Sequence, residues 1–297
     1  MRTYIVNSLY ALVLLISSSS LAAEQAPYKN IQVDNDLRQY RLFVPASYTD
    51  NTPLPLVLNF HGTSNTPDRQ EALSDFEKLA EKERFIVVTP LALFTRTAGG
   101  PITWNANKKQ GPDDVNFITL LLHQLQQDWA IDNKRIYATG FSGGARMSSR
   151  LGCDLADRIA AIAPVAGLRF PTDCQPSRPV PIMTFHGEKD GINHFILRED
   201  SPVYWTMGVE DALAGWIKRN QCKAPVQTAL SSSLTEFAYQ GCSHHADIVF
   251  YRSTEAGHTW PGSPMAEQML RFGLGKTEES LAATDLIWQF FKAHPLP

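Results

Sequence analysis

The sequence contains no long block of like charges and no apolar run long enough to span a bilayer. Its 27 basic and 30 acidic residues are interspersed and give a formal net charge of −3. This balance argues against nucleic acid or an anionic membrane surface as a partner and fits a small or neutral substrate better. The short apolar run near the start ends in small residues at Ala22 and Ala23, which is typical of a signal peptide, since a spanning helix needs about 20 apolar residues. We expect residues 1–23 to direct export, leaving a secreted or periplasmic chain without a membrane anchor.

Cysteine is scarce, and no two cysteines stand at C-x-x-C spacing. Structural zinc sites commonly use such spacing, so we discount a zinc site and expect no metal. The exported part of the chain can form disulfides, for which four cysteines allow three connectivities. Sequential pairing, Cys153 with Cys174 and Cys222 with Cys242, closes two loops of similar length. Each loop is worth about 3 kcal/mol in the chain-entropy model, and we predict this pairing.

Internal repeats, low-complexity linkers and a second composition regime are also absent, which favours one domain over residues 24–297. Short apolar runs alternate with amphipathic helical segments. This alternation predicts an α/β fold, with a mostly parallel sheet covered by helices on both faces. We expect strands at 39–45, 54–60, 85–90, 135–140, 159–167, 180–187, 234–239 and 247–253. We expect helices at 68–84, 113–129, 143–153 and about 278–292, and a long loop at 92–111.

One serine stands between glycines in the run Gly140-Phe141-Ser142-Gly143-Gly144, a G-x-S-x-G pattern. The pattern alone is weak, because about one chain of this length in ten contains it by chance. Its place between an expected strand and an expected helix is where a nucleophile elbow forms, and glycines are needed there because side chains would clash. The alternative is an ordinary serine helix cap. We predict that Ser142 is a nucleophile.

A serine hydroxyl needs a base within reach, and that base needs an acid to orient it. In sheet hydrolases the chain order is Ser, then Asp or Glu, then His. Asp190 follows an expected strand, and His258 lies in a turn after the last expected strand. Glu188 and Asp200 are rival acids, but Glu188 is only two residues beyond His186 and Asp200 lies deeper in a polar loop. We predict Asp190 as the acid and His258 as the base.

Acyl transfer also needs hydrogen-bond donors aimed at the developing oxyanion. In this architecture one donor is the backbone N–H of the residue after the nucleophile, here Gly143. The second is expected from a loop after an early strand, where Thr63 follows His61 and Gly62. The simpler interpretation of that loop is a tight turn, and both can hold because they use the same backbone.

Over nearly all of the mature chain, the sequence resembles the poly(3-hydroxybutyrate) depolymerase-like esterases, an α/β-hydrolase family whose relatives include feruloyl and acetylxylan esterases. The matching stretches are "FHGT", "DDVNFI", "RIYATGFSGGARMS", "AAIAPVAG", "FHGEKD" and "GHTWPG". The resemblance implies that Ser142, Asp190 and His258 are nucleophile, acid and base, and that Thr63 and Gly143 form the oxyanion hole. Two departures bear on the substrate. Thr63 stands where the family often has cysteine, and "TWNAN" stands where it has a "WNW"-like loop.

The expected function is therefore an exported serine carboxylesterase that forms an acyl-enzyme and needs no metal or organic cofactor. Its substrates would be feruloyl or acetyl esters of polysaccharides, or hydroxyalkanoate oligomers, and nothing indicates an obligate protein partner. A poly(3-hydroxybutyrate) depolymerase proper is the alternative. A catalytically idle binding module is an answer of another class, although no member of the triad is missing. Trp104 and Trp260 lie in loops expected to border the site, where each ring is either a substrate wall or core packing.

Overall fold

The structure is a computed structural model that describes residues 28–108 and 111–297. The expected signal peptide, residues 1–23, lies outside the described residues. Among the residues that are described, no helix is both long enough and apolar enough to cross a lipid bilayer.

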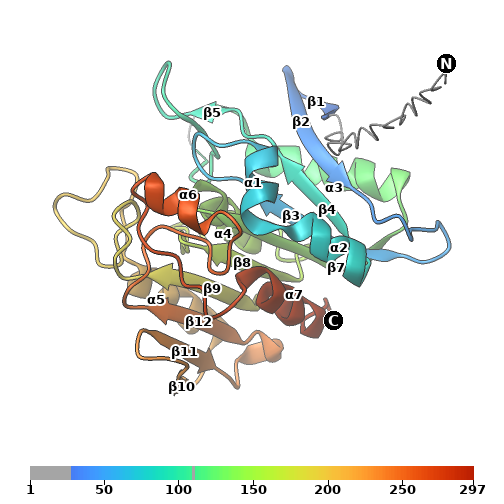
Figure 1. The fold of residues 1–297 in the computed structure, drawn as a ribbon. Helices are drawn as coiled ribbons and strands as arrows, with labels where there is room; N and C mark the ends of the chain where they lie inside the picture. The colour runs from blue at the N-terminus through green and yellow to red at the C-terminus, as the bar shows by residue number, and fades with distance from the viewer. Residues whose placement is uncertain (1–27, 109–110) are drawn as a thin grey trace, which may run out of the picture.

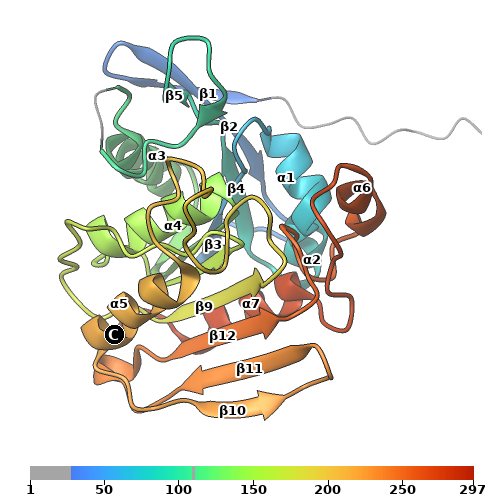
Figure 2. The ribbon, with the colours of Figure 1, turned by 90° about the vertical axis from the view of Figure 1, so that its left-hand side faces the viewer.

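In the described part of the chain, ten strands form one sheet in the order β1-β2-β4-β3-β7-β8-β9-β12-β11-β10 (Figure 1). The strands are β1 (Lys29–Val33), β2 (Asp36–Phe43), β3 (Leu54–Phe60), β4 (Ile86–Pro90), β7 (Ile131–Phe141), β8 (Ala161–Val165), β9 (Ile182–Gly187), β10 (Val226–Ala229), β11 (Leu234–Tyr239) and β12 (Ile248–Ser253). The central run from β4 to β12 is parallel. Antiparallel strands close both edges, β1 and β2 at one and β11 and β10 at the other (Figure 2). A separate two-stranded ribbon, β5 (Phe94–Thr95) with β6 (Ile102–Thr103), lies in the long loop after β4.

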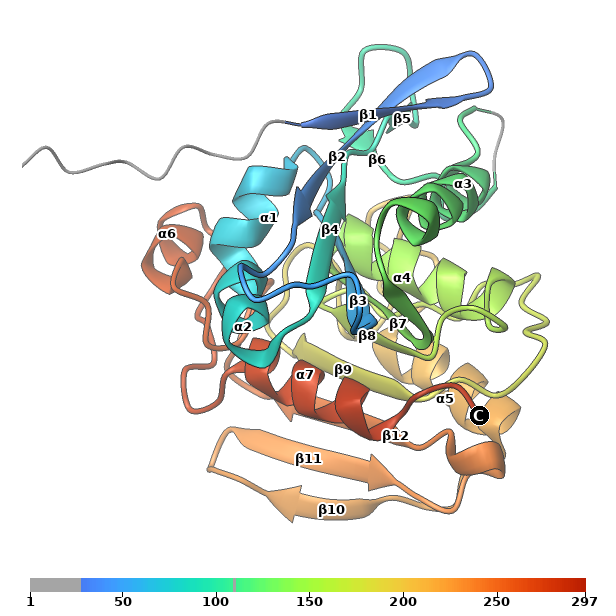
Figure 3. The same cartoon turned by 90° about the vertical axis from the view of Figure 1, so that its right-hand side faces the viewer.

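Helices cover both faces of the sheet (Figures 1 and 3). The helices are α1 (Pro67–Ser74), α2 (Phe76–Glu83), α3 (Asp114–Asp128), α4 (Gly143–Asp154), α5 (Val209–Asn220), α6 (Ala266–Arg271) and α7 (Ala283–Ala293). Buried side chains of α3, α4 and α5 pack in one hydrophobic cluster, and those of α1, α2, α6 and α7 in the other. The expected fold class is confirmed.

Strand β3 shows how the sequence builds two cores. Every residue of β3 is buried, as expected for a parallel strand covered on both sides. Leu56 and Leu58 belong to the cluster with α3 and α4, whereas Val57 between them belongs to the cluster with α2 and α7. Because side chains alternate between faces with a period of two, one apolar run supplies both layers.

The single helix expected over 68–84 is wrong in one respect, because the structure breaks it into α1 and α2 at Asp75. Asp75 has φ 55° and ψ 30°, the left-handed conformation that Asp tolerates better than most residues. Its backbone N–H bonds the Glu71 carbonyl and ends α1. The last helix also begins later than expected, at Ala283.

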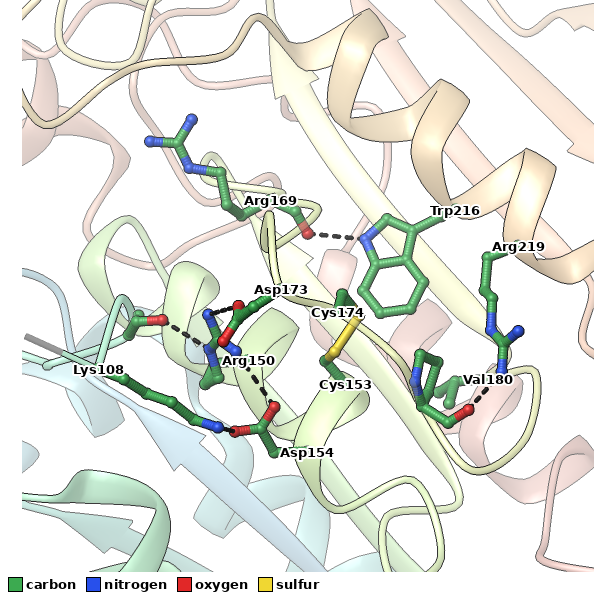
Figure 4. Close-up of a disulfide and its surroundings, with 12 residues drawn as sticks. Lys108, Arg150, Cys153, Asp154, Arg169, Asp173, Cys174, Val180, Trp216 and Arg219 are labelled. Atoms are coloured by element: carbon green, nitrogen blue, oxygen red, sulfur yellow. Dashed lines mark hydrogen bonds and ion pairs between the residues drawn. A yellow bond between two sulfur atoms is a disulfide. The ribbon is translucent and has the colours of Figure 1, made fainter.

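Two disulfides hold loops to the fold. Cys153, at the end of α4, is bonded to Cys174 in the segment between β8 and β9 (Figure 4). Beside it, Arg150 binds both Asp154, at 3.1 Å, and Asp173, at 2.7 Å. The second disulfide, Cys222 to Cys242, joins the chain after α5 to the turn between β11 and β12.

Candidate active site

Ser142 occupies a sharp turn between β7 and α4. Its backbone has φ 55° and ψ −109°, a conformation that costs free energy for any residue except glycine. Gly140 and Gly144 are required around it. A Cβ on Gly140 would lie 2.7 Å from the Phe60 carbonyl oxygen, and one on Gly144 would overlap that same oxygen. Ser142 stands at the N-cap position of α4, but its side chain makes no capping hydrogen bond. The hydroxyl is therefore not used as a helix cap.

Asp190 lies in the turn after β9, with its side chain fully buried. Oδ2 accepts a hydrogen bond from His258 Nδ1 at 2.7 Å and lies 3.2 Å from His186 Nε2. Oδ1 accepts hydrogen bonds from the backbone N–H groups of Ile192, at 2.8 Å, and Asn193, at 2.7 Å. Burial alone would raise the pKa of Asp190, but His258 and His186 outweigh it and hold that pKa well below its usual range. The carboxylate is thus ionised and fixed in one orientation.

His258 reaches the serine turn from the loop after β12. Its ring lies 4.7 Å, centroid to centroid, from that of Phe141, the residue before Ser142. The loop is held close to a second segment, since the His258 N–H bonds Leu274 O at 2.6 Å and Gly257 has backbone atoms of Leu274 where a Cβ would be. Within the described residues no hydrogen bond joins Ser142 Oγ to His258. Such bonds are often long before substrate binds.

The rival acids face elsewhere. Glu188 forms an ion pair with Arg252 of β12. Asp200 pairs with Arg198 and is 72% exposed. Neither carboxylate contacts His258, so the structure places Asp190 alone of the three against the imidazole.

Two further buried histidines, His186 and His61, hydrogen-bond the loops of the site and hold them in place. His186 Nε2 lies 2.9 Å from Asn193 O as well as near Asp190, and so braces the acid-bearing turn. His61 accepts the Ala92 N–H on Nε2 at 3.0 Å, while its Nδ1 lies 2.7 Å from Gly62 O. Burial lowers the pKa of His61 to about 4. A neutral His61 thus holds the loop that precedes Thr63.

The backbones of Thr63 and Gly143 meet beside Ser142. A Cβ on Gly143 would lie 3.0 Å from the Thr63 nitrogen and 2.7 Å from Thr63 Oγ1. Thr63 Oγ1 also hydrogen-bonds Thr103 Oγ1 at 2.8 Å. The two N–H groups predicted to stabilise an oxyanion are therefore adjacent, and glycine is required for their approach.

The two tryptophans have different surroundings. Trp104 is 3% exposed, packs edge-on against Phe60 and donates its indole N–H to His61 O at 2.8 Å, and it also lines a cavity of about 430 Å³. Trp260 is 1% exposed, donates to Thr284 at 3.0 Å and packs edge-on against Phe76 in the core. Both rings are thus buried, and Trp104 is the one that also lines this cavity.

A second cavity, of about 510 Å³, adjoins Thr63 and Phe141 and is closed by the apolar side chains of Met265, Met269 and Phe272 from and around α6. Sequence reasoning missed the α6 wall. That short segment has no motif or long periodic pattern that would have marked it. Both cavities are thus lined in part by residues close to the serine turn, Thr63 and Phe141 for one and Arg146 for the other.

A parallel sheet whose strand ends bring together a serine turn, a buried Asp–His pair and adjacent backbone N–H groups defines an α/β-hydrolase. Comparison with solved structures agrees on the fold: an acetyl xylan esterase from Aspergillus awamori superposes with a TM-score of 0.59 at 16% identity, covering 84% of this chain and 100% of that one. No family model matches the sequence.

Curated proteins similar to this chain include several feruloyl esterases. Feruloyl esterase B of Piromyces equi is 30% identical over 233 residues, covering 72% of this chain and 41% of that protein. A probable feruloyl esterase C of Aspergillus clavatus is 26% identical over 265 residues, covering 86% of this chain and 84% of that protein. The chain spans less than half the length of the first two curated relatives it matches. The chain is thus similar in sequence to feruloyl esterases and has the α/β-hydrolase fold.

Proposed function

We propose that this chain is an exported serine carboxylesterase whose nucleophile is Ser142, with His258 as base and Asp190 as the acid that orients it. The observation that carries the proposal is the 2.7 Å contact of His258 Nδ1 with the buried Asp190, beside the strained turn of Ser142. We assign residues 24–297 to one catalytic domain. The disulfides and the apolar leader support export.

The chemistry follows from these positions. His258 takes the Ser142 hydroxyl proton on Nε2 as Oγ attacks the ester carbonyl carbon, and the tetrahedral oxyanion accepts the N–H groups of Thr63 and Gly143. The oxyanion collapses, and the alcohol leaves with the proton from the imidazolium. Water then repeats the sequence on the acyl-enzyme and releases the acid. The ionised Asp190 stabilises the imidazolium at each step.

For the substrate we propose feruloyl or acetyl esters of polysaccharides, or hydroxyalkanoate oligomers. The names of the relatives support the first two classes. The two cavities near the serine turn provide room for an acyl group and an alcohol group.

The test is hydrolysis by the purified protein of para-nitrophenyl esters, methyl ferulate, acetylated xylan and hydroxybutyrate oligomers. Ser142→Ala should lower kcat by about 10⁴-fold or more on every substrate the wild type cleaves. Ser232→Ala, in the exposed turn between β10 and β11, is the matched control and should keep wild-type rates. A Ser142→Ala protein that retained a tenth of wild-type turnover would overturn the assignment.

A further inference from the structure

The cavity beside Trp104 combines aromatic walls with positive charge. Its lining includes the rings of Phe94, Trp104 and Tyr204 and the side chains of Arg96 and Arg146, around a volume of about 430 Å³. The Arg96 guanidinium lies 4.3 Å from the centroid of the Tyr204 ring, and that of Arg146 lies 4.9 Å from it. Two cations thus face one aromatic side chain in a single cavity.

Arg146 lacks the partner that a buried cation normally has, and Arg96, which is exposed, has no ion-pair partner among the described residues either. Arg146 is 7% exposed, and its guanidinium makes one long hydrogen bond, 3.4 Å, to Asn193 Oδ1. Among the described residues, no carboxylate oxygen lies within ion-pair distance of Arg96 or Arg146. Burial, with repulsion from Arg96, lowers the pKa of Arg146 to about 9. An unpaired cation in such surroundings costs free energy that an anion would offset.

The other buried arginines of the chain show the contrast. Arg38 binds Asp114 at 2.7 Å, and Arg150 binds two carboxylates. Arg169 donates to two backbone carbonyl oxygens. Asp190 attracts Arg146 through space, but its oxygens are already occupied by two histidines and two backbone N–H groups. Arg146 therefore retains hydrogen-bonding capacity for a ligand.

The cavity borders the proposed reaction centre on two sides. Arg146 lies one turn beyond Ser142 in α4, with its N–H bonded to Ser142 O at 3.2 Å, so the two Cα atoms are about 6 Å apart. On the other side, Trp104 binds His61 O, two residues before Thr63. A group held in the cavity would be part of the same substrate as the ester.

We propose that Arg96 and Arg146 bind a free carboxylate carried by the ester substrate, with a planar or pyranose ring of that substrate against Trp104 and Tyr204. The substrate class is thus acidic esters: either the alcohol part carries the carboxylate, as in a uronate-bearing saccharide, or the acyl part does, as in a half-ester of a dicarboxylic acid. This inference rests on the proposed esterase function. The planar guanidinium matches a carboxylate in a bidentate geometry.

The test compares ester pairs that differ only in charge. For the acyl part, the pair is the para-nitrophenyl half-ester of adipic acid and the same ester of adipic acid monoamide. For the alcohol part, it is meta-acetoxybenzoate and meta-acetoxybenzamide. The wild type should favour the anionic member of at least one pair by about tenfold or more in kcat/KM, the scale of a charge-assisted hydrogen bond, and which pair shows it identifies the source. The preference should shrink as salt is added.

Arg96→Gln and Arg146→Gln should each reduce that ratio toward one. Arg96 is on the surface, so its variant gives a result even if the Arg146 variant does not fold. Arg198→Gln, which removes an exposed arginine paired with Asp200, is the control and should keep the ratio. A wild type that cleaves both pairs without preference, or a preference that survives both glutamine variants, would overturn the carboxylate subsite. A wild type that cleaves none of the four esters would instead count against the proposed function.

Discussion

His258 Nδ1 lies 2.7 Å from Asp190 Oδ2, and each group belongs to a loop that leaves the same edge of the sheet. The two residues are 68 positions apart in sequence, so only the parallel pairing of β9 with β12 brings them together. Because Nδ1 is held by the carboxylate, Nε2 is the nitrogen left to act on a serine.

Replacing Asp190 by Asn should lower kcat by about 10⁴-fold with little change in folding, because an amide can hold His258 in the wrong tautomer. Circular dichroism should confirm the fold, and steady-state rates on a para-nitrophenyl ester give the loss. Glu188→Gln and Asp200→Asn are the controls and should stay within a few-fold of wild type. If either control caused the larger loss, Asp190 would not be the acid.

Gly144→Ala should prevent folding or lower stability by several kcal/mol, because its Cβ would overlap the Phe60 carbonyl oxygen. Gly191→Ala is the matched change, since nothing lies within 4 Å of a Cβ there, and it should alter stability by less than about 1 kcal/mol. Urea unfolding of both variants measures the difference. Equal stabilities would show that the serine turn is not held as tightly as described.

We expect substitution of the two tryptophans to differ in its effect on substrate preference. Trp260→Ala removes a core side chain and should cost about 3 to 5 kcal/mol of unfolding free energy. Trp104→Ala also removes a buried side chain, but it should in addition lower kcat/KM for methyl ferulate more than for para-nitrophenyl acetate, by the roughly 1 to 3 kcal/mol of a modest pocket difference. Equal losses on both esters would remove Trp104 from the substrate wall.

Glu71 should make stability depend on pH. It is buried against Asn59 and Thr89, and burial, with repulsion from Glu77, raises its pKa to about 7. Between its ordinary pKa of 4.5 and about 7 the folded state holds a proton that the unfolded state has lost, so this contribution to stability falls as pH rises through that window. The loss is on the order of 3 kcal/mol.

Glu71→Gln keeps the shape without the charge. Urea unfolding at pH 5 and pH 8 should therefore show a smaller drop for the variant than for the wild type. Groups that do not interact with Glu71 titrate equally in both proteins and cancel in the comparison. Identical drops would mean that Glu71 is ionised in the folded state.

The apolar runs predicted the parallel core well, because strands buried on both faces have a distinctive composition. The ends of helices and the breaks within them were harder to predict. Asp75, for example, ends α1 in a left-handed backbone conformation that Asp tolerates but that its presence does not imply. The candidate site residues could be named because each stands at a strand end in a recognisable order. Apart from Trp104, the side chains of the cavity walls could not be named. Arg96 and Tyr204 lie in irregular loops far apart in sequence, and their meeting depends on tertiary packing that leaves no periodic signal.

Covalent labelling most directly tests the claim that Ser142 is the nucleophile. A fluorophosphonate reacts with a serine that a neighbouring base activates, and the site of attachment can be read by tandem mass spectrometry of the digested protein. We expect one adduct per chain, on the peptide that contains Ser142, formed slowly or not at all in the Asp190→Asn variant. An adduct on another residue, or esterase activity that persists in fully labelled protein, would contradict the assignment.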